Sequence, residues 1–284
     1  MSYTNPDALV STEWLAAHLE APDVRVVDGS WHMPAAKRDP RAEYNDQHIP
    51  GSVFFDIDEI KDDANPLPHM LPSPEKFASR VRKMGLGDGN RIVVYDTTGV
   101  SAAARVWWMF RVFGHEDVAV LDGGMGKWLA EGRPVTAEKT IPQERHFTAR
   151  TNSFLVREYD QVLANLRSGR EQFVDARSTG RFNGTEPEPR AGLASGHAPG
   201  SINLPFTRML NMADKTMLPA DNIRKAFEDA GVDIGSPLVT SCGSGVTACI
   251  LTLGLYLIGR TDAPVFDGSW TEWAGNPDSP IETS

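Results

Sequence analysis

The sequence predicts an α/β protein made of two tandem domains, each a parallel sheet with helices on both faces. Short β-branched apolar segments alternate along the chain with segments of helical periodicity. The same order of motifs occurs twice, at an offset of 145 to 149 residues. Because a strand, a helix and the next parallel strand form a right-handed unit, each copy is expected to build its own sheet.

Composition narrows the possible classes of protein. A chain of 284 residues with 40% apolar residues is long enough for two domains, and its net charge of −10 argues against nucleic-acid or anionic-membrane partners. No apolar run approaches the roughly 18 residues of a membrane span, and residues 1–7 lack the features of a signal peptide. Two cysteines are too few for a disulfide framework or a structural zinc site. We expect a cytoplasmic monomer without metal or organic cofactor.

In the first half, hydroxyl caps and a proline mark two helix starts, at Ser11 and at Ser73-Pro74. Gly85 is expected to end the second of these helices. A polar stretch rich in Arg, Asp and Pro, which precedes Tyr44, is expected to be a loop. The elements expected in order are a helix at 11–19, strands at 24–28 and 53–55, a helix at 73–85, a strand at 91–96, a long helix through Phe110, and a strand at 118–121.

The second half repeats these markers in the same order. The pairs are Asp28 and Asp175, His48 and His197, Gly99 and Gly245, and Asp122 and Asp267. Since the His-x-Pro-Gly turn occurs in both halves, we interpret His48 and His197 as turn architecture. A polar segment with two prolines separates the copies. We therefore predict a first domain over 1–135, a linker over 136–155 and a second domain over 156–284.

The most informative segment is Cys242 with the residues that follow it. Apolar residues 238–240 predict a strand that stops at Cys242, and 248–258 predict a helix. Gly243 and Gly245 allow the intervening loop to turn its N–H groups inward around the sulfur. At the positive end of a helix dipole, such a thiol is expected to ionise readily and to act as a nucleophile.

Cysteines in apolar strands are usually buried and inert, and the glycine loop is what argues against that interpretation for Cys242. Cys249, inside the helix pattern, keeps the inert interpretation. At the offset of 146, Asp96 occupies the position of Cys242 in the first half. A carboxylate is a poor sulfur nucleophile, so the first half is expected to be catalytically silent.

The segment from Cys242 to Thr247 resembles the active-site loop of the 3-mercaptopyruvate sulfurtransferases, which belong to the rhodanese family. This resemblance implies two rhodanese-like domains, a persulfide on Cys242, and substrate contacts from the loop residues Gly243, Gly245, Val246 and Thr247. Rhodaneses that use thiosulfate typically carry basic side chains in this loop. Gly243 and Ser244 at these positions favour 3-mercaptopyruvate as the donor.

A second segment, 181–190, is rich in proline and is expected to be a loop. It resembles the substrate-binding motif of the family, whose two arginines fall on Arg181 and Arg190. An arginine fork matches the carboxylate and keto oxygen of a small oxo acid. Glu186 and Glu188 are expected to balance the charges of this loop.

The resemblance also implies a proton relay. An Asp, a His and the loop serine of the family fall on Asp58, His69 and Ser244. Histidine titrates near neutrality and a carboxylate can fix its tautomer, so the set can move a proton. The alternative is that His69 and Asp58 only hold the two halves together.

The predicted activity is sulfur transfer from 3-mercaptopyruvate through Cys242 to cyanide, a small thiol or a thioredoxin-type protein, with release of pyruvate. Three alternatives stay open at this point. The first is a thiosulfate sulfurtransferase, and the second is a module that carries sulfur without turnover. The third, a cysteine phosphatase, is disfavoured because Ala248 and Cys249 stand where an arginine would clamp phosphate.

Overall fold

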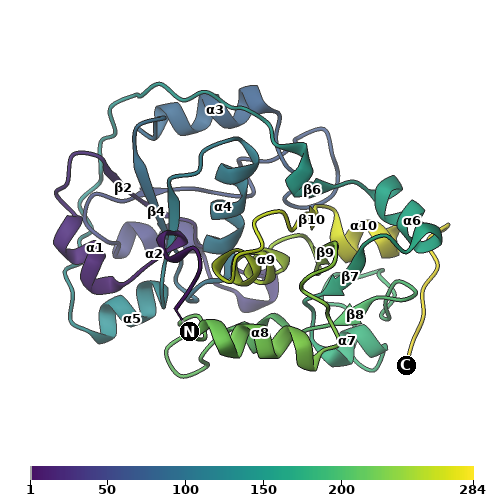
Figure 1. The fold of residues 1–284 in the computed structure, drawn as a ribbon. Coiled ribbons are helices and arrows are strands. Elements are labelled where there is room, and N and C mark those ends of the chain that lie inside the picture. Colours follow the sequence, from purple (N-terminus) through teal and green to yellow (C-terminus); the bar gives the residue numbers. More distant parts are fainter. Residues whose placement is uncertain (1) are drawn as a thin grey trace.

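The computed structural model describes residues 2–284 and contains two α/β halves, each built on a five-stranded parallel sheet (Figure 1). The strand orders are β1-β5-β4-β2-β3 and β6-β10-β9-β7-β8, so the two sheets share one topology. The predicted fold class and the internal repeat are confirmed. The strands are β1 (Leu9–Val10), β2 (Val24–Asp28), β3 (Val53–Phe54), β4 (Arg91–Tyr95), β5 (Val118–Leu121), β6 (Val156–Arg157), β7 (Gln172–Asp175), β8 (Ile202–Asn203), β9 (Leu238–Ser241) and β10 (Val265–Phe266).

Ten α-helices connect or cover these strands in residues 2–284, and none of them is long and apolar enough to cross a membrane. They are α1 (Thr12–His18), α2 (Pro40–Asp46), α3 (Pro74–Lys83), α4 (Ser101–Val112), α5 (Gly124–Ala130), α6 (Tyr159–Ser168), α7 (Thr179–Asn183), α8 (Ala220–Asp229), α9 (Ala248–Leu257) and α10 (Ser269–Gly275). Short 3-10 helices are η1 (Pro6–Ala8), η2 (Pro34–Ala36), η3 (Ser153–Leu155) and η4 (Phe206–Met209).

The predicted helix caps are present. The Ser11 hydroxyl accepts the Trp14 N–H at the start of α1, and the Ser73 hydroxyl accepts the Lys76 N–H at the start of α3. The expectation of a loop before Tyr44 is wrong, because α2 forms there. Asp39 caps that helix by accepting two backbone N–H groups, and proline occupies its first position. The polar composition of this stretch suggested a loop, although Asp39 followed by Pro40 is a pattern typical of a helix start.

The two halves share one apolar core. The largest buried cluster includes Trp107 and Phe110 of α4 together with Ile250 and Leu253 of α9. These two helices pack against each other in the centre of the molecule (Figure 1). Separating the halves would therefore expose the largest apolar cluster to water.

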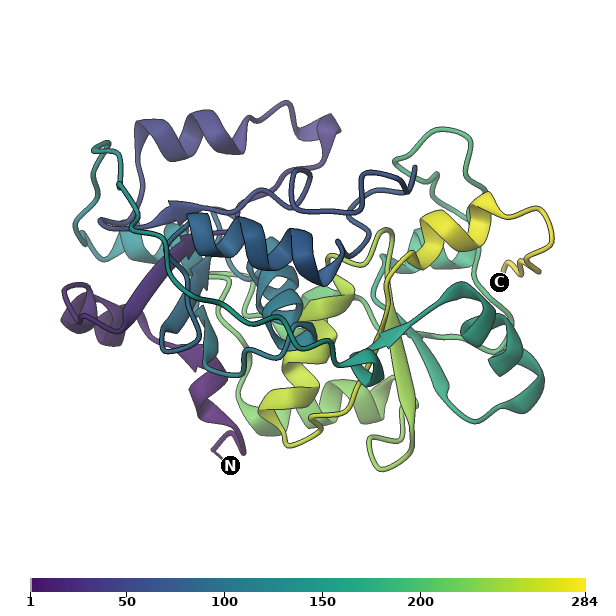
Figure 2. The same cartoon turned by 90° about the horizontal axis from the view of Figure 1, so that it is seen from above.

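The connection between the halves is docked along its length. Phe147 is fully buried, and its carbonyl accepts two N–H groups of Arg82. The Arg150 N–H donates to the Phe113 carbonyl. Figure 2 shows this segment, in teal, crossing the first half as an extended strap before it reaches β6. The segment predicted as a linker thus has its own buried contacts.

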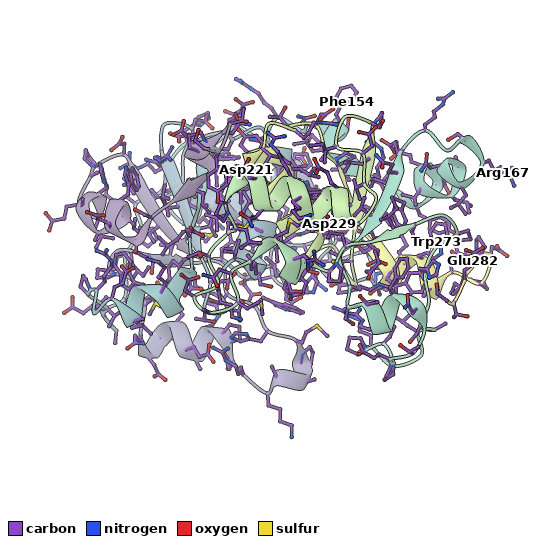
Figure 3. All side chains as sticks on the ribbon, turned by 60° about the horizontal axis from the view of Figure 1, so that its bottom comes forward. Phe154, Arg167, Asp221, Asp229, Trp273 and Glu282 are labelled. Carbon is purple, nitrogen blue, oxygen red and sulfur yellow. The ribbon has the colours of Figure 1, made fainter. Side chains whose placement is uncertain are left out.

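Helix α8 covers the outer side of α9. Its apolar face buries Ile223 and Phe227. The opposite face is turned to solvent, where Asp221 and Asp229 mark the two ends of the helix in Figure 3. Because of this amphipathic pattern, α8 shields the shared apolar core from solvent.

Two aspartates join the halves reciprocally. The Asp122 carboxylate, after β5, accepts the Met217 N–H at 2.7 Å, and the Asp267 carboxylate, after β10, accepts the Leu71 N–H at 2.8 Å. Asp122 and Asp267 are equivalent in the repeat, and so are Leu71 and Met217. Each half therefore uses the same carboxylate to hold a loop of the other half.

This geometry predicts an unusual pH dependence for Asp122. Burial, reinforced by Asp214, raises the pKa of Asp122 to about 6, against roughly 4 for a free aspartate. The folded state then binds the proton more tightly, so the contribution of Asp122 to stability falls as pH rises from about 4 to about 6. Asp122→Asn, which keeps an acceptor for Met217, should be close to the wild type at pH 4 and exceed it by about 3 kcal/mol at pH 7.5.

Urea unfolding at the two pH values measures this difference. The exposed Asp278 provides the control Asp278→Asn, for which no such change with pH is expected. An equal effect of Asp122→Asn at both pH values would contradict the prediction.

Candidate active site

Cys242 directly follows β9 and begins the loop that leads into α9. Every residue of β9 is buried, and Cys242 itself is only 2% exposed. It nevertheless lines a cavity of about 540 Å³. The sulfur is thus shielded from bulk water but accessible from one side.

Both halves line this cavity. The second half contributes Cys242 and the residues that follow it, and the first half contributes Trp31, Thr98 and Ser101. The cavity lies beyond the carboxyl ends of β4 and β9, which is where parallel α/β sheets commonly bind ligands. The loop residues on its wall are Gly243, Ser244, Val246 and Thr247; Gly245 is not on it.

The start of α10 fixes the backbone of the Cys242 loop. The Trp270 N–H donates to the Cys242 carbonyl at 3.0 Å, and the Thr271 N–H donates to the Gly243 carbonyl at 2.9 Å. Within residues 2–284, no acceptor is paired with the backbone N–H groups of residues 243–247. Gly245 has a φ of +73°, which a side chain would disfavour. The loop therefore presents a set of free amide donors, as the glycine spacing predicts.

The equivalent loop of the first half already holds an anion. The buried Asp96 carboxylate accepts the Thr98 N–H at 2.7 Å, the Thr98 hydroxyl at 2.7 Å and the Ala103 N–H at 2.8 Å. The same loop geometry can thus bind negative charge, and here its donors are taken by its own carboxylate.

Arg181 and Arg190 both reach the Cys242 loop. Arg190 donates from Nη2 to the Ser244 hydroxyl at 3.1 Å. A Cβ built on Gly243 would lie 3.0 Å from Nη2 of Arg181 and 3.8 Å from Nη1 of Arg190. Burial lowers the pKa of Arg190, while the Cys242 sulfur acts in the opposite direction. The expectation that 181–190 is entirely loop is wrong, because Arg181 lies in α7, which ends at Asn183.

A buried glutamate orients Arg181. The Glu188 carboxylate accepts Nε and Nη2 of Arg181 at 3.1 and 2.6 Å, and its side chain is 2% exposed. The same carboxylate accepts Nη1 of Arg177 at 2.8 Å. Glu188 therefore balances loop charge, as expected, and also fixes the direction of an arginine fork.

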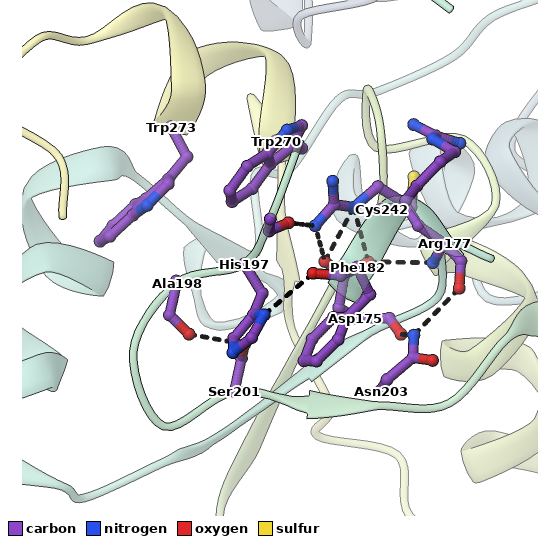
Figure 4. A network of polar contacts seen from close by, with 12 residues as sticks. Asp175, Arg177, Phe182, His197, Ala198, Ser201, Asn203, Cys242, Trp270 and Trp273 are labelled. Atoms are coloured by element: carbon purple, nitrogen blue, oxygen red, sulfur yellow. Dashed lines mark hydrogen bonds and ion pairs between the residues drawn. The ribbon is translucent and has the colours of Figure 1, made fainter. Parts of the chain in front are cut away.

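Arg177 was not identified from the sequence. Its buried guanidinium donates to the Asp175 carboxylate and to the Gly196 carbonyl, and it lies 4.0 Å from the centre of the Trp270 ring (Figure 4). Ser30 is its counterpart in the first half. That difference between two otherwise matched segments is the signal that could have found it.

The His-x-Pro-Gly turns behave alike in both halves. Nδ1 of His48 donates to the Tyr44 carbonyl, and Nδ1 of His197 donates to the Phe182 carbonyl (Figure 4). Each ring also stacks on the aromatic residue whose carbonyl it binds. These contacts agree with a structural role for both histidines.

The structure brings His69 and Asp58 together but does not join them to Ser244. Nδ1 of His69 lies 2.9 Å from the Asp58 carboxylate, although the angle is not that of a hydrogen bond. Trp31 donates to the other oxygen of Asp58 at 2.8 Å. Burial lowers the pKa of His69, and Asp58 only partly offsets this. In the described part of the chain, no hydrogen bond links His69 to Ser244.

Cys249 is fully buried, and its S–H donates to the Gly245 carbonyl at 3.2 Å. Burial raises the pKa of the Cys249 thiol well above its usual range. Arg105, also not identified from the sequence, donates to the same carbonyl from below. Cys249 thus has the environment of an inert core thiol.

Comparisons with known proteins agree with this geometry. The family model described as "Rhodanese-like domain" matches the chain twice, over residues 11–131 and over residues 158–276. Human 3-mercaptopyruvate sulfurtransferase is 46% identical, over 94% of this chain and 91% of its own length. The protein named "Thiosulfate/3-mercaptopyruvate sulfurtransferase 1, mitochondrial" from Arabidopsis thaliana is 44% identical, over 99% of this chain and 80% of its own length. The crystal structure of SseA from Escherichia coli, described among 3-mercaptopyruvate sulfotransferases, superposes with a TM-score of 0.85 at 34% identity, covering 93% of this chain and 98% of SseA.

The Cys242 loop should not tolerate a side chain at Gly245. An alanine there would adopt a positive φ and place its Cβ 2.6 Å from the Asp267 carbonyl. Gly245→Ala should cost about 2 kcal/mol of stability and slow the alkylation of Cys242 by iodoacetamide. Gly126→Ala in α5, where a Cβ meets no atom within 4 Å, is the matched control and should be neutral or stabilising. Similar thermal unfolding of the two variants would contradict the proposed constraint.

Proposed function

This chain belongs to the rhodanese family, and from that premise and the site geometry we propose that it transfers sulfur from 3-mercaptopyruvate to a thiophilic acceptor through a persulfide on Cys242. The observation that carries the proposal is the convergence of two arginines on the Cys242 loop, inside one cavity. Arg190 and Arg181 can bind the carboxylate and keto oxygen of an oxo acid. The loop amides supply further donors for developing negative charge.

In the first half-reaction, the Cys242 thiolate attacks the sulfur of the donor. The carbon–sulfur bond breaks, and its electron pair passes to carbon-3 as the enolate of pyruvate. The arginines stabilise the enolate oxygen, and protonation at carbon-3 gives pyruvate. The loop residues Gly243, Gly245, Val246 and Thr247 surround the new persulfide and stabilise its charge through their N–H groups.

Ser244, His69 and Asp58 are proposed to move the donor thiol proton. Support comes from the 2.9 Å separation between His69 and Asp58, and from the burial that lowers the pKa of His69. A neutral imidazole at physiological pH can accept a proton. Ser244 touches Arg190, so substrate binding at Arg190 has a direct route to the serine.

In the second half-reaction, the outer sulfur of the persulfide passes to cyanide, a small thiol or a thioredoxin-type protein. We place this chemistry in the second half only, because Asp96 holds the nucleophile position of the first and its carboxylate already occupies the loop donors. We also propose the domain boundaries predicted from the sequence: a first domain over 1–135, a linker over 136–155 and a second domain over 156–284. A cytoplasmic monomer completes it, since a reducing compartment keeps Cys242 and Cys249 as the free thiols seen here.

Thiosulfate is the second candidate donor. The relative from Arabidopsis thaliana carries both donors in its name, so that name does not separate them. The loop of this chain has Gly243 and Ser244 in place of basic side chains, which favours the oxo acid. A module that only carries sulfur would load one sulfur and then fail to turn over with excess acceptor.

Intact-mass analysis tests the persulfide. After mixing with 3-mercaptopyruvate, the wild-type protein should gain the mass of one sulfur atom and release one equivalent of pyruvate. Cys242→Ser should gain none, whereas Cys249→Ser should still gain one because Cys249 is buried and held as a thiol. An unchanged wild-type mass would exclude the mechanism.

Donor kinetics test the arginines. Arg190→Met should lower kcat/KM for 3-mercaptopyruvate about 100-fold, since a charge-assisted hydrogen bond in the site is lost. Arg167→Met is the control, because Arg167 is exposed at the far edge of the second half (Figure 3) and should leave kcat/KM unchanged. The wild type should prefer 3-mercaptopyruvate over thiosulfate by kcat/KM. A preference for thiosulfate would support the second candidate.

A further inference from the structure

A charged side chain of the first half lies directly beneath the active-site loop of the second. Arg105, on α4, is fully buried. Its Nη1 donates to the Gly245 carbonyl at 3.2 Å, and a Cβ built on Gly245 would lie 2.9 Å from that nitrogen. The Cys242 loop therefore rests on a guanidinium supplied by the other half.

The guanidinium also bridges two further parts of the site. Nη2 of Arg105 lies 2.7 Å from the Asp267 carboxylate and donates to the His69 carbonyl. The second Asp267 oxygen accepts the Leu71 N–H, two residues beyond His69. The contact with Asp267 is an ion pair without hydrogen-bond geometry, because its Oδ1 has no hydrogen-bond partner in the described residues. A charge pair this deep is costly to bury, so its retention calls for a reason.

The repeat shows that this cation is specific to the side of the molecule that holds the cysteine. The position equivalent to Arg105 in α9 is Leu251. Leu251 is fully buried in the shared core, and within residues 2–284 no arginine forms an ion pair with Asp122, whereas Arg105 does so with Asp267. Within the described residues, the buried arginine of α4 therefore accompanies the loop that carries Cys242 and not the loop that carries Asp96.

We propose that Arg105 is a positioning residue for the Cys242 nucleophile: it fixes the Gly245 carbonyl and sets positive charge beneath the loop, while Asp267 limits how much of that charge reaches the sulfur. The inference rests on the proposed function, in which Cys242 is the reacting group. It gives the silent half a part in the chemistry that the Cys242 loop alone does not supply.

Several charged or titratable groups surround the loop besides this pair. They are Arg181 and Arg190 on the substrate side, Cys249 in α9, Glu272 in α10, and His69 with Asp58 in the first half. Burial raises the pKa of Glu272 to about 7. Since all of these stay in place when only Arg105 or Asp267 is changed, differences between variants report on the pair.

The two members of the pair should act with opposite sign. Arg105→Met removes the cation and should move the pH midpoint of Cys242 alkylation by iodoacetamide upward by about one unit, a tenfold slower reaction below the midpoint. Asp267→Asn leaves the cation uncompensated and should move the midpoint downward. The double variant should fall between them, and Arg105→Lys should lie nearer the wild type than Arg105→Met. Cys242→Ser measures the background from Cys249.

Asp122→Asn is the matched control, because it alters the equivalent carboxylate of the first half away from the Cys242 loop, and its midpoint should not move. A purely structural pair would lower thermal stability in both single variants without moving their midpoints in opposite directions. That result would overturn the inference. If Arg105→Met does not fold, Asp267→Asn decides alone, since its amide can still accept the Leu71 N–H, and a midpoint that stays or rises refutes the proposal.

The two proposals fail separately. Absence of the persulfide after donor treatment, with the opposed midpoint shifts intact, would remove the sulfur-transfer function and leave the role of Arg105 standing. Formation of the persulfide with unchanged pH midpoints would support the sulfur-transfer function and refute the role of Arg105.

Discussion

The site depends on the two backbone hydrogen bonds by which α10 holds the carbonyls of Cys242 and Gly243. With those carbonyls turned towards α10, the N–H groups of Gly243 and Ser244 point away from α10, and within residues 2–284 no acceptor takes them. Every other feature of the site builds on that orientation. Arg181 and Arg190 approach this loop from the cavity, so the positive charge of the site lies beside Cys242.

The duplicated halves have diverged around one scaffold. In both, a buried strand ends at a glycine loop and continues into an apolar helix, yet one loop carries Asp96 and the other Cys242. The Asp96 carboxylate accepts the Thr98 N–H of the first loop, whereas the equivalent Ser244 N–H of the second loop has no acceptor within residues 2–284. A second pair of equivalent positions also differs in charge, with Arg105 in the first half and Leu251 in the second. At both pairs of positions the halves therefore differ in whether the side chain is charged or uncharged.

The sequence was sufficient for the features that depend on local pattern. Strand periodicity, helix caps and the internal repeat predicted both sheets, and the glycine spacing predicted the loop amides. Arg181 and Arg190 required the family resemblance, because isolated arginines carry no local signal. Helices α2 and α7 were missed, since polar and proline-rich stretches concealed their short turns. Arg105 and Arg177 were missed as site residues because their partners are brought near only by the tertiary fold.

The packing of α4 on α9 has a consequence for shortened forms of the chain. Each half completes the interior of the other, because α4 and α9 bury their apolar side chains against one another. A chain cut down to the second half would leave the apolar side chains of α9 that face α4 exposed to water. The first half is therefore required to bury the core of the second, independently of any part it has in chemistry.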